Sequence, residues 1–223
     1  MFSPLARIRS NDELDAGFSL IEVMVAIAII AVVAISAGSL TIAGINTAST
    51  QQRRQIAVTI ASGTMESINS MSASVTDATG VSALYTGRSA SKVHAAWTAN
   101  AGVTGLAQTY ETSDSTATAS SVAIVPITSP SPLLQSGTNY TVTTLIGTCF
   151  QPTTAPASGH WDCTTVPGYA TAPSVIPTGY TPLMRVIVVV RWTPGFGCGS
   201  NGCSTVVSSL VDSHNDLIWV SHG

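Results

Sequence analysis

The hydrophobic residues of this chain are concentrated in one run near the N-terminus. Between Val23 and Ala37 the only polar side chain is Ser36. A helix over residues 18–37 would be ~30 Å long at ~1.5 Å per residue, which matches the hydrocarbon thickness of a bilayer. The pattern therefore predicts a membrane-spanning helix. One carboxylate, that of Glu22, lies inside the run, where a charge is costly and usually has a function.

The helical pattern continues beyond the apolar run but becomes amphipathic. No proline occurs in residues 18–72, which we predict as one helix. Gly38, Gly44 and Gly63 are its weak points, because glycine costs ~1 kcal/mol in a helix interior, and we expect local melting or bending near Gly38–Gly44. One face of the upper half is apolar and the other is largely polar. The apolar face holds Ala57, Ile60, Ala61, Met65 and Ile68, and the polar side holds Arg54, Ser62, Glu66 and Asn69.

Alternating and β-branched runs predict strands in the second half of the chain. A shorter candidate, Ser121–Val125, is ended by Pro126. Consecutive strands of this kind predict an antiparallel meander that packs one face on the apolar side of the helix. The expected fold class is α+β, with a long N-terminal helix on a C-terminal antiparallel sheet. The predicted strands are residues 140–146, 183–192, 205–211 and 217–220.

The segments between these elements carry weaker signals. His94 and Trp97 fit a short helix, and Thr112–Ser121 reads as a loop. Gly147–Thr181 is a long connection rich in proline, glycine and threonine. A connection of that length is usually functional or disordered.

Composition and charge exclude some classes of function. The chain has 223 residues, a net charge of −3 and only 9% charged residues. This length fits one domain plus a membrane segment. No basic cluster is larger than the pair Arg53-Arg54, so the chain lacks the basic stripe of a nucleic-acid-binding protein, and we do not expect nucleic acid as a partner.

The charges that flank the apolar run predict its orientation. Arg7 and Arg9 precede it, and the next basic residue is Arg53. The positive-inside rule then places the N-terminus in the cytoplasm and the C-terminal domain outside. An ordinary signal peptide cut at Ala34-Ile35-Ser36, or an uncleaved anchor, are the alternatives. Glu22 argues against the signal peptide, because it would lie within the hydrophobic region.

The residues at the start of the run form a recognisable motif, Gly17-Phe18-Ser19-Leu20-Ile21-Glu22 followed by Val-Met-Val-Ala. It resembles the type III prepilin signal of type IV pilins and type II secretion pseudopilins. The resemblance implies that a prepilin peptidase cuts after Gly17 and methylates Phe18. It also implies that Glu22 faces the Phe18 ammonium of a neighbouring subunit, because pairing offsets much of the cost of burying either charge.

The resemblance also implies a domain organisation and a set of partners. Residues 1–17 would be the leader, 18–38 the transmembrane half of the helix, 39–72 its amphipathic half, and 73–223 an extracytoplasmic domain. The protein would wait in the membrane as a single-pass subunit, in contact with lipid, and then join a pilus or the cell surface. Its partners would be other pilin or pseudopilin subunits, the prepilin peptidase and the inner-membrane assembly platform. The long helix and the valine-rich strand pair resemble minor pilins and the minor pseudopilins of type II secretion more than major pilins.

Four cysteines lie beyond the apolar run, as the local pairs Cys149/Cys163 and Cys198/Cys203. In an exported domain they predict disulfides, although three connectivities are possible. The local pairing would tie down the first part of the 147–181 connection and close a tight glycine-rich hairpin. A zinc site with Cys149 and His160 is the competing interpretation, but its spacing departs from the usual close pairs.

No catalytic or phosphate-binding motif is present, so we expect neither an enzyme nor a cofactor or metal. The leading hypothesis is a minor pilin or pseudopilin that acts by assembly. The second is a secreted or membrane-anchored binding module that uses the 147–181 connection as an adhesive surface.

Overall fold

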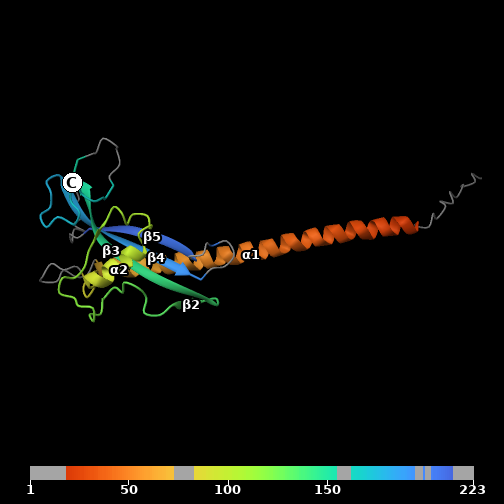
Figure 1. Cartoon of the computed structure of the whole chain (residues 1–223), viewed down its shortest axis with the longest axis horizontal. Helices are drawn as coiled ribbons and strands as arrows, with labels where there is room; N and C mark the ends of the chain where they lie inside the picture. The colour runs from red at the N-terminus through yellow and green to blue at the C-terminus, as the bar shows by residue number, and fades with distance from the viewer. Residues whose placement is uncertain (1–18, 73–82, 155–161, 194–197, 199–201, 213–223) are drawn as a thin grey trace, which may run out of the picture. The chain divides into compact units, whose positions relative to one another are not determined.

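The computed structural model describes residues 19–72, 83–154, 162–193, 198 and 202–212. The chain divides into two units, one up to Thr47 and one from Ala48. The helix α1 (Leu20–Ser72) begins in the first unit and ends in the second. The remaining elements, which Figure 1 labels except for β1, belong to the second unit. They are α2 (Ala90–Ala99), β1 (Tyr110–Glu111), β2 (Leu133–Gln135), β3 (Thr138–Pro152), β4 (Tyr180–Trp192) and β5 (Cys203–Asp212).

The predicted long helix is confirmed over 53 residues. The expected melting near Gly38 and Gly44 is wrong, because α1 is uninterrupted at both positions. Two glycine costs of ~1 kcal/mol each do not break a cooperative helix of this length.

The sheet is antiparallel and centred on β3. Its order is β1-β3-β4-β5, and β2 pairs with another part of β3. Val188 of β4 lies between Thr144 of β3 and Val207 of β5. The predicted meander is confirmed for these three strands, whereas the predicted strand 217–220 lies outside the described residues. β1 and β2 were not predicted.

The strands are longer than expected, which corrects the bounds of the 147–181 connection. β3 continues to Pro152 and β4 begins at Tyr180, so the connection is residues 153–179. Pro182 of β4 faces Phe150 of β3, and among the described residues pairing with β5 begins at the next position, Leu183. A proline near the start of a strand interrupts few ladder hydrogen bonds.

The predicted strand Ser121–Val125 is also wrong. The Ile124 N–H donates to Thr86 O at 3.2 Å, and Val125 O accepts from the buried Arg88 guanidinium. These are single hydrogen bonds to a turn and a side chain, so no ladder forms. The expected loop at Thr112–Ser121 is confirmed.

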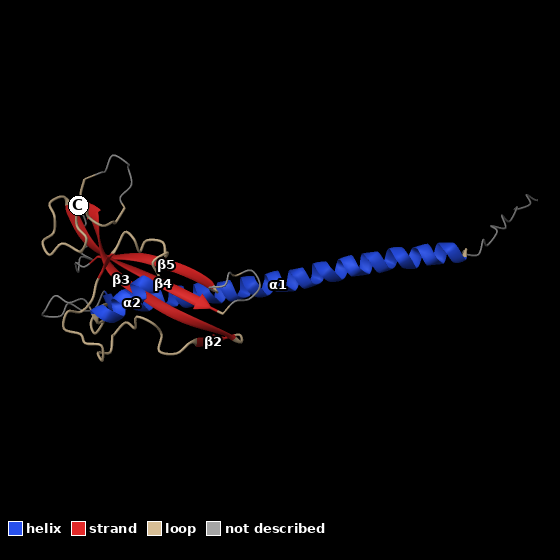
Figure 2. Ribbon diagram, in the orientation of Figure 1, coloured by secondary structure: helices blue, strands red, loops and turns tan. Residues whose placement is uncertain are grey.

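The first face of the sheet packs on the upper part of α1, as Figure 2 shows. Ala57 and Ala61 are fully buried there, and their small side chains let the helix approach the strands closely. Met65 and Ile68 complete the buried face, while the polar residues predicted for the opposite side are exposed. The sheet contributes Tyr140, Val142, Ile146, Met184, Val186, Val188, Val190 and Trp192 to this core.

The second face of the sheet is covered by α2 and the turn that follows it. Leu145, Ile187 and Val189 pack there with Leu106, and Trp97 of α2 lies against them. Gly147 of β3 allows this close approach. A Cβ at Gly147 would lie 2.9 Å from Trp97 Cη2 and even closer to the Tyr110 carbonyl oxygen.

Two polar residues fix the turn before α2. Arg88 is fully buried and donates to Val125 O at 3.0 Å and to Thr144 O. Burial lowers the pKa of Arg88 to about 10, so the guanidinium is still charged at neutral pH. Asp114 accepts hydrogen bonds from the Thr116 hydroxyl at 2.6 Å and from the Gly87 and Thr116 amides at 2.8 Å. The Thr116 hydroxyl, followed by the two amides, holds the pKa of Asp114 below its ordinary value.

Candidate functional site

The first turn of α1 begins at Ser19. The Ser19 carbonyl accepts hydrogen bonds from the amides of Glu22, at 2.9 Å, and of Val23, at 3.2 Å. Gly17 and Phe18, the predicted processing residues, lie outside the described residues. The structure therefore places the helix start two residues after the predicted cleavage bond.

Glu22 lies in this first turn, where the helix dipole favours a negative charge. Its side chain is exposed and has no partner among the described residues. A carboxylate at this position is therefore available to a cation from outside the subunit. It is the only acidic residue of the first turn.

The lower part of α1 carries an apolar surface on all sides. We call this the apolar helix surface; none of its membrane-length segment is buried within the protein. Moving such side chains out of water is favourable by about 1.5–3 kcal/mol each, so this surface must be covered by lipid or by other helices. Its exposed large residues are Leu20, Ile21, Val23, Met24, Val25, Ile27, Ile29, Ile30, Val32, Val33, Ile35, Leu40, Ile42 and Ile45.

The hydroxyl groups within this surface are satisfied by their own helix. Ser36 Oγ donates to Val32 O and Thr41 Oγ1 to Ala37 O, both at 2.9 Å. Thr47 bonds in the same way to Ala43 O. Such bonds to the preceding turn let a hydroxyl enter an apolar environment without an external partner.

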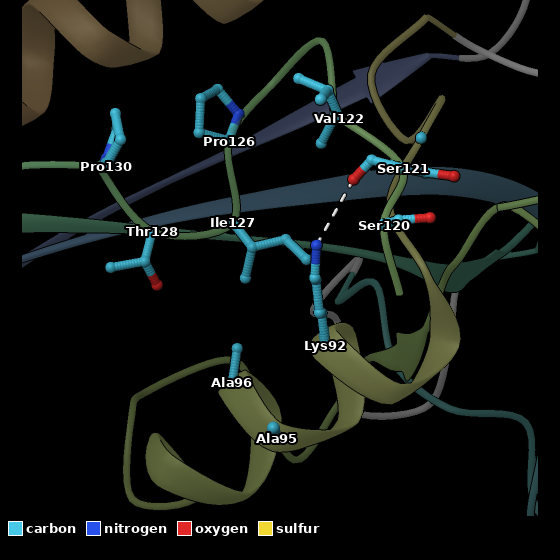
Figure 3. Close-up of a pocket in the computed structure, with 12 residues that line it drawn as sticks. Lys92, Ala95, Ala96, Ser120, Ser121, Val122, Pro126, Ile127, Thr128 and Pro130 are labelled. Carbon is cyan, nitrogen blue, oxygen red and sulfur yellow. Dashed lines mark hydrogen bonds between the residues drawn. The ribbon is translucent and has the colours of Figure 1, made fainter. Parts of the chain in front are cut away.

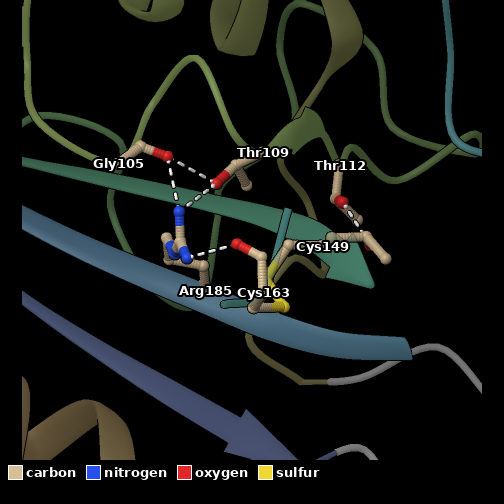
Figure 4. Close-up of a disulfide and its surroundings, with 7 residues drawn as sticks. Gly105, Thr109, Thr112, Cys149, Cys163 and Arg185 are labelled. Atoms are coloured by element: carbon tan, nitrogen blue, oxygen red, sulfur yellow. Dashed lines mark hydrogen bonds between the residues drawn. A yellow bond between two sulfur atoms is a disulfide. The ribbon is translucent and has the colours of Figure 1, made fainter. Parts of the chain in front are cut away.

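A second candidate surface is the 153–179 connection, whose middle is fastened to the sheet. The structure pairs Cys149 with Cys163, both buried, at a Cα–Cα distance of 5.3 Å (Figure 4). Next to this disulfide, Phe150 and Thr164 exchange backbone hydrogen bonds of 2.8 and 3.0 Å. The chain after Cys163 therefore runs beside β3 as a short bridge.

Arg185 of β4 holds the same segment from the side (Figure 4). Its guanidinium donates to Cys163 O at 2.7 Å and to Gly105 O at 2.8 Å. Burial lowers the pKa of Arg185, and the charge of Asp162 opposes this shift. The sequence places Arg185 only within the predicted strand 183–192, and nothing local in the sequence indicates a partner 80 residues away.

Tyr110 anchors the next part of the connection. Its hydroxyl accepts a hydrogen bond from Val166 N at 2.9 Å and lies 3.1 Å from Tyr169 O, and its ring packs edge-on against Phe150. Beyond these anchors, Val175 is 78% exposed, and Tyr169 and Ile176 are about half exposed. The connection therefore exposes apolar side chains from a segment that these contacts hold against the sheet.

The other two cysteines, Cys198 and Cys203, are paired at a Cα–Cα distance of 5.1 Å next to the end of β4. Because all four cysteines are in disulfides, none offers a thiolate to a metal. Within the described part of the chain, no cluster of three or more His, Cys, Asp or Glu residues could hold a metal ion. His160, the other residue of the competing zinc interpretation, lies outside that part.

Comparison with known proteins found a match for the N-terminal segment. Residues 14–38 match the family model described as the prokaryotic N-terminal methylation motif, the signature of type IV pilins and pseudopilins. The match supports a precursor like those of type IV pilins or pseudopilins, and the described fold, a long N-terminal helix packed on a C-terminal antiparallel sheet, is α+β and pilin-like. The match covers the predicted cleavage bond and the lower part of α1, and the globular domain lies outside it. No curated protein and no solved structure matches the chain.

The motif implies a substrate of a prepilin peptidase that assembles with similar subunits. Together with α1, the one described helix that is long and apolar enough to cross a membrane, it supports a membrane-anchored protein. These findings agree with the resemblance read from the sequence.

Proposed function

We propose that the protein is a minor pilin or pseudopilin that acts as a structural subunit of a filament. This proposal rests on the methylation motif at the start of an apolar helix. The membrane-length segment of that helix is not buried by any other described part of the protein. Lipid covers this surface before assembly, and the helices of other subunits cover it afterwards. Both surroundings are similarly apolar, so the exchange needs a specific contact to fix the register.

Glu22 supplies that contact in our proposal. Cleavage after Gly17 frees the Phe18 amine, which keeps its positive charge when methylated. Four residues at ~1.5 Å place Glu22 ~6 Å further along the helix axis. The Glu22 carboxylate of one subunit would then pair with the Phe18 ammonium of its neighbour. At ~4 Å and an effective dielectric constant of ~20 the Coulomb attraction within such a pair is ~4 kcal/mol, and the cost of taking both charges out of water offsets part of it.

The flanking charges support one orientation. Arg7 and Arg9 precede the helix and stay cytoplasmic under the positive-inside rule. Residues 1–17 are then the leader and the sheet domain is extracytoplasmic. Disulfides in that domain fit an oxidising compartment. The partners we propose are other pilin or pseudopilin subunits, the prepilin peptidase and the inner-membrane assembly platform.

The extracytoplasmic domain favours a minor subunit. It has two disulfides, and one of them fastens a long connection between β3 and β4. The resemblance implies that a major pilin usually closes a single C-terminal disulfide loop. A subunit with a more elaborate outer domain suits a filament tip or a low-copy position.

The mass of the mature N-terminus tests the processing step. We expect a chain that begins at Phe18 and carries one methyl group. A chain that begins near Ala37, or that keeps its leader in a strain with active peptidase, would contradict the proposal.

Substitution of Glu22 tests the assembly step. Glu22→Ala should leave cleavage intact and lower incorporation into filaments at least tenfold, because the partner ammonium then remains unpaired. Glu66→Ala, an exposed acid of the upper helix, is the matched control. Equal filament incorporation of both variants would refute the role of Glu22.

The exposed apolar residues of the 153–179 connection favour a second candidate, a secreted or anchored binding module. In that case the chain functions without filament incorporation, and its activity depends on Tyr169, Val175 and Ile176. A mature start near Ala37 together with intact surface binding would support this alternative.

A further inference from the structure

A groove lies between α2 and the segment of residues 120–130, on the second face of the sheet domain (Figure 3). Its volume is about 610 Å³, within the range of small-ligand sites. We call it the α2 groove. It is separate from the apolar helix surface and from the 153–179 connection.

The walls of the α2 groove are mainly apolar. Ala95 and Ala96 form the α2 side, and their short side chains leave the space open. Pro126, Ile127 and Pro130 form the opposite side. A groove with this lining binds an apolar group, since the lining offers few polar side chains.

Lys92 adds one positive charge to this apolar groove. It is the single lysine of the chain. In Figure 3 its side chain rises from α2 towards the opposite wall, where Nζ lies 3.4 Å from Ser121 O. This long hydrogen bond is its one partner among the described residues, and no carboxylate pairs with it there. The ammonium is therefore complementary to an anionic group.

The apolar surface continues along the same segment. Val122, which lines the groove, is 90% exposed, and Ile124, just beyond the lining, is 54% exposed. The amides of Val122 and Ala123 make no hydrogen bond to another described residue, whereas the Val122 carbonyl oxygen lies against Gly87. The carbonyls of an extended peptide lying beside them could therefore accept hydrogen bonds from these two amides, as peptides do at open strand edges.

We propose that the α2 groove binds an extended apolar peptide segment of another protein, with a side-chain carboxylate of that segment on Lys92. The open apolar groove, its exposed apolar neighbours and the two amides without a partner among the described residues favour a peptide over a compact molecule. The cation fixes the position of one acidic residue within it. This site does not depend on N-terminal processing or on filament assembly.

The single lysine makes the site directly observable. In full-length mature protein labelled with 15N-lysine and held in detergent micelles, one amide resonance reports on Lys92. The probes are five acetylated and amidated pentapeptides of alternating valine and isoleucine, with one glutamate moved through the five positions. Five matched peptides carry glutamine instead, and decanoate serves as a small apolar carboxylate.

At least one glutamate peptide should shift the Lys92 resonance and bind at least about fivefold more tightly than its glutamine counterpart, as expected for ~1 kcal/mol from an exposed ion pair. Anisotropy of the labelled peptide should show that Lys92→Met removes this preference and Lys92→Arg keeps it. Ala95→Trp, which fills the groove, should abolish binding without lowering the Tm. Arg54→Met, a loss of charge on exposed α1, should change nothing.

Three results would overturn the proposal. The first is that no peptide of the panel binds below about 5 mM. The second is that glutamate and glutamine peptides bind equally. The third is that decanoate alone binds, which would assign the groove to a small amphiphile. Because each measurement uses mature protein and needs no filament, it fails or succeeds independently of the Glu22 test.

Discussion

The disulfide between Cys149 and Cys163 should stabilise the domain measurably, because it closes a loop in the unfolded chain. The cysteines are 14 residues apart. Chain entropy gives about 3 kcal/mol for a loop of ~15 residues. The double variant Cys149→Ala/Cys163→Ala should therefore unfold about 3 kcal/mol more easily, and it also loses the fastening of the 153–179 connection.

Urea unfolding of the mature protein in mild detergent, followed by tryptophan fluorescence, measures this change, because Trp192 lies in the core between α1 and the sheet. The matched control is Cys198→Ala/Cys203→Ala, whose cysteines are only 5 residues apart. The same relation gives about 2 kcal/mol for that loop. A loss below about 1 kcal/mol for the first pair, or a larger loss for the second, would refute the reasoning from loop length.

The remaining predictions concern packing and charge within the same domain. Ala61→Leu forces α1 away from the sheet and should cost about 1–3 kcal/mol in urea unfolding, whereas Ser62→Leu on the exposed side should change stability little. Gly147→Ala should lower the Tm through collision with the tyrosine carbonyl and tryptophan ring beside it, while Gly102→Ala, which has open space around it, should not. The folded pKa of Asp114 is lowered, so its stabilisation is present above the unfolded pKa and is lost as the pH falls through the folded one. In Asp114→Asn the free energy of unfolding should accordingly fall less steeply as the pH is lowered. An unchanged slope would contradict a stabilising role of the Asp114 carboxylate.

Several elements could be predicted because their signals are local. The apolar run and the buried face of α1 follow from spacing within a few turns, and the strands β3, β4 and β5 follow from runs of β-branched residues. The motif that ends in Glu22 is likewise contiguous. Local signals also explain the error at Ser121–Val125, where a β-branched run has no neighbouring strand to pair with.

The other features depend on contacts between distant residues. Tyr110 fastens the long connection through a backbone amide 56 positions away, and Arg185 links Cys163 O of that connection to the carbonyl of Gly105, 80 positions from Arg185. The α2 groove exists because two alanines of α2 face a segment that comes about 30 residues later in the chain. Neither composition nor periodicity carries that information.

The hydroxyls of Ser36, Thr41 and Thr47 donate to carbonyls of their own helix. These side chains therefore need no hydrogen-bond partner from lipid or from a neighbouring helix. Such a rod can rotate or slide beside a neighbour at little cost. In the proposed filament, the register of this helix would then depend on Glu22 alone. Subunits with different outer domains could consequently share the same lower helix.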